Sequence, residues 1–165
     1  MLATSDFTGT PPSQEQQQHR LLNDIYVLLD DCDRRALLDF DITPSQYSVL
    51  LLLDIDEGRQ LVALADRLLV ARSTITRLVA ALEAMGLIVR VRDPRDRRAQ
   101  RVRLTPTGAD LRERAHAAHH AALRRWLAPL KDADQRQLIA LLGDMRAALE
   151  SSLAISAERD ERTIP

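Results

Sequence analysis

Nine arginines between residues 72 and 103 give this sequence its most distinctive chemistry. Only Glu83, Asp93 and Asp96 are acidic in that stretch, so it carries a net charge of +6, against −1 for the whole chain of 165 residues. Residues 1–57, in contrast, hold three basic and eleven acidic side chains. The planar guanidinium group can form paired hydrogen bonds with phosphates and with guanine edges. This segregation of charge therefore indicates a polyanionic partner, with nucleic acid as the first candidate.

Apolar spacing predicts that the first of these arginines lie on a short helix. Apolar side chains recur at helical intervals over residues 61–68 and 75–85, and Gly86 ends the second segment. A tight turn at residues 69–71 joins the two segments, so we expect a helix-turn-helix whose second helix opens with RSTITR at 72–77. A helix of this kind fits the major groove of DNA and places its N-terminal side chains against base edges.

The following arginines alternate with valines, which is typical of a β-strand. Residues 89–92 read VRVR, a turn at 93–96 follows, and residues 101–104 read RVRL. We therefore expect a hairpin with one apolar face and one arginine face. A helix-turn-helix followed by such a hairpin is a winged helix, whose wing can enter the minor groove while its strand arginines meet phosphates.

The rest of the chain predicts helices. Two capping-box patterns begin helices over about residues 13–38 and 47–55, and the second is apolar enough that we expect it to be buried on all sides. Two more helices are predicted over about 107–127 and 132–153. The capping boxes are Ser13 with Gln16 and Thr43 with Gln46.

Four motifs in this order resemble the MarR (multiple-antibiotic-resistance regulator) family of transcription factors. They are TITRLV at 74–79, LEAMGLI at 82–88, DPRDRR at 93–98 and LTPTG at 104–108. The resemblance covers about residues 14–153. It implies a homodimer in which the first helix and the last two helices intertwine and each winged helix forms a lobe.

With this resemblance, the expected fold class is mainly α with a small β-wing, a winged helix-turn-helix joined to a helical dimerisation region. We predict five segments along the chain. They are a disordered tail at 1–12, N-terminal helices for dimerisation and core at 13–57, the DNA-binding winged helix-turn-helix at 58–105, C-terminal dimerisation helices at 106–153 and a frayed tail at 154–165.

The resemblance also carries DNA-contacting roles to individual residues. Arg98 takes the place of the family's minor-groove arginine, and Asp96 takes that of the carboxylate that braces it. Ala71 departs from the family because a hydroxyl or carboxylate is common at this N-cap, so the helix is open to a start one residue later, at Ser73. The full predicted DNA-binding set is Arg72, Ser73, Thr74, Thr76, Arg77, Arg95, Asp96, Arg97 and Arg98.

Members of this family often sense a ligand in the crevice between the dimerisation region and the winged helix. Ser48 stands where urate-responsive relatives have aspartate, so urate is not the expected ligand. The residues that are candidates to line such a pocket are Tyr26, Asp30, Tyr47, Leu51 and Arg77.

One cysteine and three histidines are candidates for redox sensing and for metal sensing. Cys32 lies among three aspartates that disfavour a thiolate, which predicts a structural cysteine. His116, His119 and His120 fall on one predicted helix, and the i, i+4 spacing of the outer pair can clamp a metal. Because zinc-sensing relatives use a further histidine where Ser48 stands, we expect a solvated helix face and no metal site. A metal-responsive regulator remains an alternative.

The sequence predicts a DNA-binding regulator and no enzyme. We find no phosphate-binding glycine loop, metal-protease motif or catalytic pairing, and expect no cofactor. A single cysteine excludes an intrachain disulfide, and apolar runs fall short of the ~20 residues of a membrane span. We therefore expect a soluble cytoplasmic homodimer that represses transcription from a pseudo-palindromic operator in double-stranded DNA and is released by a small-molecule effector. A winged helix used for protein contact is the other alternative.

Overall fold

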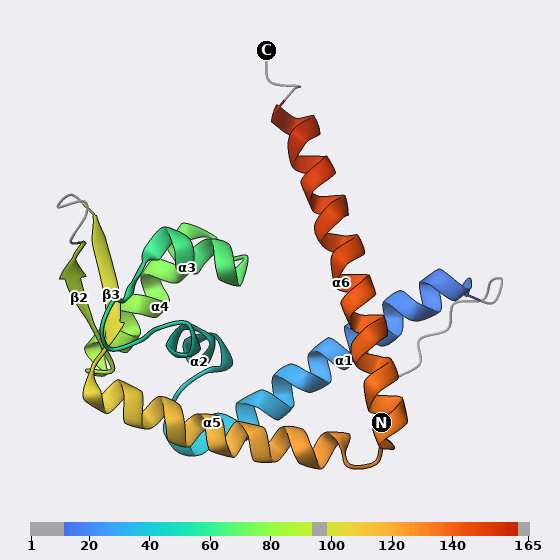
Figure 1. Ribbon diagram of the computed structural model, residues 1–165, viewed down its shortest axis with the longest axis horizontal. Helices are drawn as coiled ribbons and strands as arrows, with labels where there is room; N and C mark the ends of the chain where they lie inside the picture. The colour runs from blue at the N-terminus through green and yellow to red at the C-terminus, as the bar shows by residue number, and fades with distance from the viewer. Residues whose placement is uncertain (1–11, 94–98, 162–165) are drawn as a thin grey trace. The chain divides into compact units, whose positions relative to one another are not determined.

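The computed structural model describes residues 12–93 and 99–161. The chain divides into two compact units, residues 1–122 and 123–165. The first is mostly helical with a small antiparallel sheet, and the second contains one long helix (Figure 1). This is the expected fold class. The elements are α1 (Gln14–Leu37), the 3₁₀ turn η1 (Leu38–Phe40), α2 (Pro44–Leu51), β1 (Arg59–Gln60), α3 (Leu61–Leu68), α4 (Arg72–Ala84), β2 (Ile88–Arg92), β3 (Gln100–Leu104), α5 (Pro106–Leu127) and α6 (Asp132–Glu161).

Both predicted capping boxes are confirmed. The Ser13 hydroxyl accepts the N–H of Gln16 at 3.3 Å, while the Gln16 side chain accepts the N–H of Ser13 at 2.9 Å. Thr43 and Gln46 repeat the exchange at the start of α2, at 3.2 and 2.8 Å. Each box satisfies two donors that a helix start would otherwise leave open, and so sets the first residue of its helix.

Helix α2 is shorter than predicted, and it is not buried on all sides. It ends at Leu51, well before the predicted end at residue 55, and Leu51 is 45% exposed. The Asp54 carboxylate accepts the backbone N–H groups of Glu57 and Gly58 at 2.7 and 2.9 Å, which turns the chain towards β1. The Asp54 side chain therefore organises the turn between α2 and β1, and part of the apolar run lies after the end of the helix.

Helices α3 and α4 form the predicted helix-turn-helix. Leu69, in the turn, adopts a left-handed conformation with φ of 53°, and the N–H of Val70 donates to the carbonyl of Ala65 at 3.1 Å. This is the hydrogen-bond pattern with which helices commonly end. Helix α4 begins at Arg72 with Ala71 as its N-cap, so the alternative start at Ser73 is wrong.

The wing belongs to a sheet of three strands, of which the sequence predicted two. Strand β3 lies in the centre and pairs antiparallel with β1 on one side and β2 on the other. Strand β1 is two residues long, too short to show alternation. It joins the segment before α3 directly to the wing.

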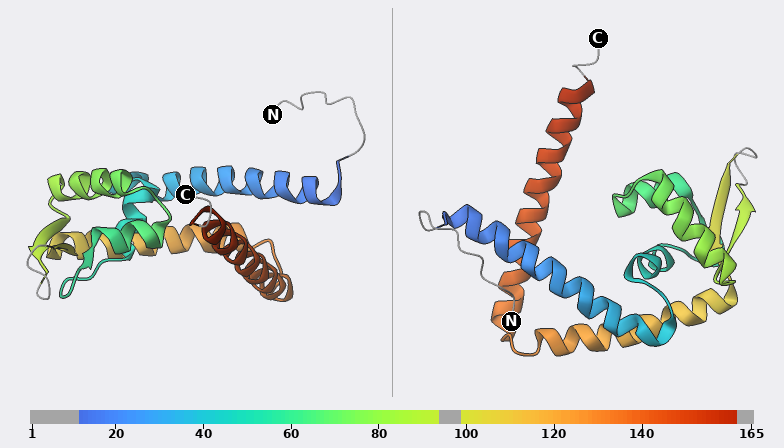
Figure 2. Two further views of the ribbon diagram at one scale, coloured as in Figure 1. Left: turned by 90° about the horizontal axis from the view of Figure 1, so that it is seen from above. Right: turned by 180° about the vertical axis from the view of Figure 1, so that it is seen from behind.

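Gly108 brings the start of α5 against the turn between α4 and β2. A Cβ at this position would lie 1.8 Å from the carbonyl oxygen of Leu87, so no side chain fits without moving the backbone. Thr105 caps the same helix start, with its hydroxyl donating to the Gly86 carbonyl and accepting the N–H of Gly108. Helix α5 therefore leaves the sheet directly from β3, as Figures 1 and 2 show. The fully buried aliphatic core includes Leu37, Val49, Leu50, Leu64, Ile75, Val79, Leu82, Val102 and Leu104.

The second unit contains the end of α5 and helix α6. Helix α6 runs to Glu161, past the predicted end at 153, because residues 154–161 contain no glycine or proline to stop it. Along α6 large apolar side chains are exposed, namely Leu138, Ile139, Leu141, Leu142, Leu149 and Leu153. Within the described ranges, no helix has the length and apolar character needed to cross a membrane.

Candidate nucleic-acid interface

Helix α4 has one buried and one exposed face. Ile75, Val79 and Leu82 are buried in the core of the first unit. The opposite face is exposed and polar, and Thr74 at its edge is partly buried. Helical periodicity alone produces this division, since the buried positions are spaced by three and four residues. The predicted α4 residues on the exposed face are Arg72, Ser73, Thr76 and Arg77.

The exposed polar residues lie in the first two turns of α4, next to its N-terminus. Ala71 provides no side-chain cap, and Thr76 instead donates its hydroxyl to the carbonyl of Arg72 at 2.8 Å. An uncapped helix start presents backbone N–H groups and a positive partial charge to its surroundings. Together with Arg72 and Arg77, it forms a surface suited to a phosphate backbone and base edges.

The prediction that the hairpin has one apolar and one arginine face is wrong. The register pairs Arg90 with Val102 and Ile88 with Leu104, so Arg90 shares the core-facing side of the sheet. Val89 is paired with Arg103 on the other side. Arg90 is accommodated because its Nε donates to the Glu83 carboxylate on α4 at 2.9 Å. Arginines therefore occupy both faces of the hairpin. Arg90 contributes to the packing of the sheet on α4.

A buried carboxylate lies where β2 ends. Asp93 is 2% exposed and accepts hydrogen bonds from Arg101 Nε and Gln60 Nε2, both at 2.7 Å. The bond to Asp93 raises the pKa of Arg101 above its usual value. The backbone N–H of Asp93 also donates to the carbonyl of Ala99 at 3.1 Å. We call Asp93, Arg101 and Gln60 the wing-base cluster. Sequence reasoning missed it because Gln60 lies 33 positions from Asp93.

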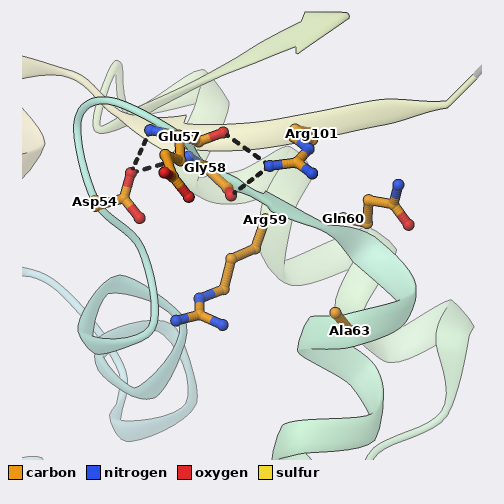
Figure 3. Close-up of a pocket in the computed structure, with 7 residues that line it drawn as sticks. All are labelled: Asp54, Glu57, Gly58, Arg59, Gln60, Ala63 and Arg101. Carbon is orange, nitrogen blue, oxygen red and sulfur yellow. Dashed lines mark hydrogen bonds between the residues drawn. The ribbon is translucent and has the colours of Figure 1, made fainter. Parts of the chain in front are cut away.

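Arg101 extends this cluster to the turn that follows α2. Its Nη1 donates to the carbonyl oxygens of Glu57 and Gly58, at 3.4 and 3.5 Å (Figure 3). The same figure shows the Asp54 carboxylate bonded to the N–H groups of these two residues. Those N–H groups, Gly58 first, lower the pKa of Asp54. The turn, β1 and β3 are thus held together by charged side chains around an open hollow. Its lining consists of Asp54, Glu57, Gly58, Arg59, Gln60, Ala63 and Arg101.

Four of the predicted DNA-contacting residues lie between the two parts of the chain that the structure describes. Arg95, Asp96, Arg97 and Arg98 lie outside the described residues, which end at Asp93 and resume at Ala99. Their predicted roles therefore remain predictions.

The residues predicted to line a ligand pocket are only partly brought together. Tyr47 is buried, and its hydroxyl forms a 3.0 Å hydrogen bond with His116 Nδ1. Leu51 lines an open groove against α5, whereas Tyr26 is 72% exposed on α1, and Asp30 forms an ion pair with Arg34 on the same helix. Arg77 lies on the exposed face of α4. The groove is lined by Leu51, Arg112, Glu113, His116 and Ala117.

The histidines of α5 are not simply a solvated face. The His119 side chain is 17% exposed, and its Nε2 lies 2.9 Å from Asp33 Oδ1 on α1. Its ring also contacts that of Tyr47, at 5.2 Å between centroids, whereas His120 is exposed. Across the described part of the chain, no group of three or more metal-binding side chains is found. Cys32, on α1, is partly buried.

Comparison with known proteins adds independent findings. A family model described as "MarR family" matches residues 40–99. The uncharacterised HTH-type transcriptional regulator YkoM of Bacillus subtilis is 31% identical over 99 residues, covering 60% of this chain and 64% of YkoM. A putative transcriptional regulatory protein for the hcr operon of Thauera aromatica is 37% identical over 101 residues, 61% of each chain. The chain thus spans less than two thirds of these relatives.

Solved structures match over a greater length. A MarR-family regulator from Rhodococcus sp. RHA1 has a TM-score of 0.72 at 28% identity and covers 82% of this chain and 96% of its own. CouR of Rhodococcus jostii RHA1 bound to p-coumaroyl-CoA has a TM-score of 0.71 at 29% identity, covering 82% and 95%. The repressor CouR on a 23-mer DNA duplex has a TM-score of 0.73 at 27% identity, covering 84% and 99%.

Proposed function

Because the chain belongs to the MarR family of DNA-binding transcriptional regulators, we propose that it is a homodimeric repressor whose release from DNA is triggered by a small ligand. The observation that carries the proposal is the exposed face of α4. Arg72, Ser73, Thr76 and Arg77 stand there on a helix fixed from behind by buried aliphatic side chains. Short polar and long cationic side chains at a helix start are suited to base edges and phosphates in a major groove.

The dimer is supported by apolar surface that a single chain leaves exposed. On α1, Leu21, Ile25, Leu28 and Leu29 are all exposed, and α6 carries a comparable series. Burying a side chain of this kind stabilises an interface by roughly 1.5–3 kcal/mol. A two-fold dimer would place two recognition helices on half-sites about 10 bp apart, which requires a pseudo-palindromic operator.

Release by a ligand is supported by two observations. The groove beside Leu51 combines an apolar wall with the polar groups of Arg112 and His116, a mixture typical of small-molecule sites. The similar repressor CouR is known in complex with DNA and with p-coumaroyl-CoA. We propose that a small molecule binding at this groove displaces the protein from its operator.

The first test is DNA binding by the wild type and by Arg98→Ala. The duplex is the one that the full-length protein selects from a randomised library, and fluorescence anisotropy measures its Kd at several salt concentrations. We expect Arg98→Ala to bind about tenfold or more weakly, with the salt slope reduced by about one, because one guanidinium contact is lost. The dimer should stay folded.

Arg114→Ala is the matched control, because Arg114 is exposed on α5 and pairs with Asp110 one turn away. It should bind the duplex as the wild type does. Undiminished affinity in Arg98→Ala would overturn the wing assignment. If the wild type selects no duplex even at low salt, the DNA-binding proposal fails and the protein-contact alternative is favoured.

A further inference from the structure

We propose that Asp93 is a positioning residue for DNA binding, which holds the base of the wing through Arg101 and Gln60 without touching DNA. The inference rests on the proposed function and assigns a role to the wing-base cluster. A charged group that is 2% exposed is costly to bury unless partners compensate for the lost hydration. Here a guanidinium and an amide supply those partners, both at 2.7 Å.

The place of the cluster in the chain gives it this role. Asp93 and Ala99 are joined by a backbone hydrogen bond, and residues 94–98 between them carry Arg95, Arg97 and Arg98. Asp93 and Ala99 are the two described residues that flank this segment, and Asp93 is the one that the wing-base cluster holds.

The partners of Asp93 connect the wing to the helix-turn-helix. Gln60 ends β1 and is followed directly by α3. Arg101, on the central strand β3, also donates to the carbonyl oxygens of the turn before β1 (Figure 3). One carboxylate thus ties the base of the wing to the start of the helix-turn-helix.

Charge alone and positioning predict opposite results when Asp93 is neutralised. A carboxylate near DNA repels the phosphates, so on charge grounds Asp93→Asn would bind DNA more tightly and with a steeper salt slope. Asparagine keeps the shape of the side chain but loses the ionic partner of Arg101. If the carboxylate positions the wing, the same substitution weakens binding.

The experiment is a double-mutant cycle on the selected duplex, using full-length wild type, Asp93→Asn, Arg98→Ala and the double variant. We expect Asp93→Asn to weaken binding about tenfold, and to add no further loss when Arg98 is already alanine. Asp110→Asn, which removes an exposed carboxylate on α5, serves as the charge control and should leave the Kd unchanged.

A Kd for Asp93→Asn equal to or lower than that of the wild type overturns the inference. So does an equal loss in both backgrounds, because the effect would not act through Arg98. If Asp93→Asn fails to fold, Arg101→Lys replaces it, since it keeps the charge and removes the Nε donor; unaltered binding by that variant overturns the inference as well. Failure of the wild type to bind any duplex would instead refute the proposed function.

Discussion

At the scale of single residues, Asp54 shows how one side chain organises the turn that follows a helix. Its carboxylate accepts the N–H groups of Glu57 and Gly58, and Gly58 follows with φ of 66°. A Cβ at Gly58 would lie 2.6 Å from the carbonyl oxygen of Val102, so the turn also needs glycine to approach β3. The position of this turn decides where β1 begins.

The lowered pKa of Asp54 predicts a pH-dependent contribution to stability. Because the folded-state pKa lies below the unfolded one, ionised Asp54 stabilises the fold above the ordinary carboxyl pKa near 4, and the effect is lost as pH falls through the lowered pKa. Asp54→Ala should lower the free energy of unfolding by about 1 kcal/mol at pH 7, with a smaller difference near pH 3. Urea denaturation at fixed protein concentration measures both values.

Asp56→Ala, two residues away and exposed, is the control and should differ little from the wild type at either pH. An Asp54→Ala deficit that is the same at pH 7 and pH 3 would contradict the assigned role.

At the scale of elements, the start of α4 departs from what helix stability alone would favour. Ala71 leaves the N-cap without a side-chain acceptor. Ala71→Ser should raise the free energy of unfolding by about 1 kcal/mol, because its hydroxyl can accept a first-turn N–H. Ala71→Asp should stabilise the fold similarly, yet weaken DNA binding because it places a carboxylate at the proposed phosphate contact.

Thermal melting and the Kd for the selected duplex measure these two effects. Equal DNA affinity in the Ser and Asp variants would show that this helix start does not approach phosphate. If neither variant raises the melting temperature, the new side-chain oxygen does not accept a first-turn N–H of α4.

The elements also show which parts of the fold the sequence could predict. Capping boxes depend on residues three apart, and helices depend on apolar spacing within a dozen residues, so both capping boxes and the presence of the helices were predicted, whereas the ends of α2 and α6 were not. The phase of the hairpin was not, because Arg90 occupies a core-facing position only by pairing with Glu83 on α4. Strand β1 was missed because its two residues become a strand only when β3 pairs with them.

At the scale of the whole molecule, the apolar surfaces of α1 and α6 predict assembly. Replacing Ile139 and Leu142 together by glutamate should convert the proposed dimer to monomer, since each buried leucine or isoleucine contributes roughly 1.5–3 kcal/mol and each new carboxylate opposes burial. Analytical ultracentrifugation measures the mass. The monomer should also lose most affinity for a two-half-site duplex.

Gln137→Glu, on the same helix and exposed, adds a charge without removing apolar surface and should leave the mass unchanged. A double variant that sediments as the wild type does would contradict the role of α6 in dimerisation.

In the candidate site too, features built from neighbouring residues were predicted and those built from distant residues were not. The segregation of charge and the α4 face were readable because the residues involved are neighbours in sequence. The bonds that join distant segments were not: Tyr47 to His116 spans 69 positions, and Asp33 to His119 spans 86. Such pairs depend on how helices pack, for which the local pattern carries no signal.

The central position of β3 has a mechanical consequence for control. This strand is bonded to β2 of the wing and to β1, which leads directly into the helix-turn-helix, so backbone hydrogen bonds connect the wing strands to the segment that enters α3. In the proposed dimer, we therefore expect an effector to move the wing strands and α4 together. Regulation would then act on the distance between the two winged-helix lobes of the dimer. DNA binding would require that distance to match the spacing of the operator half-sites.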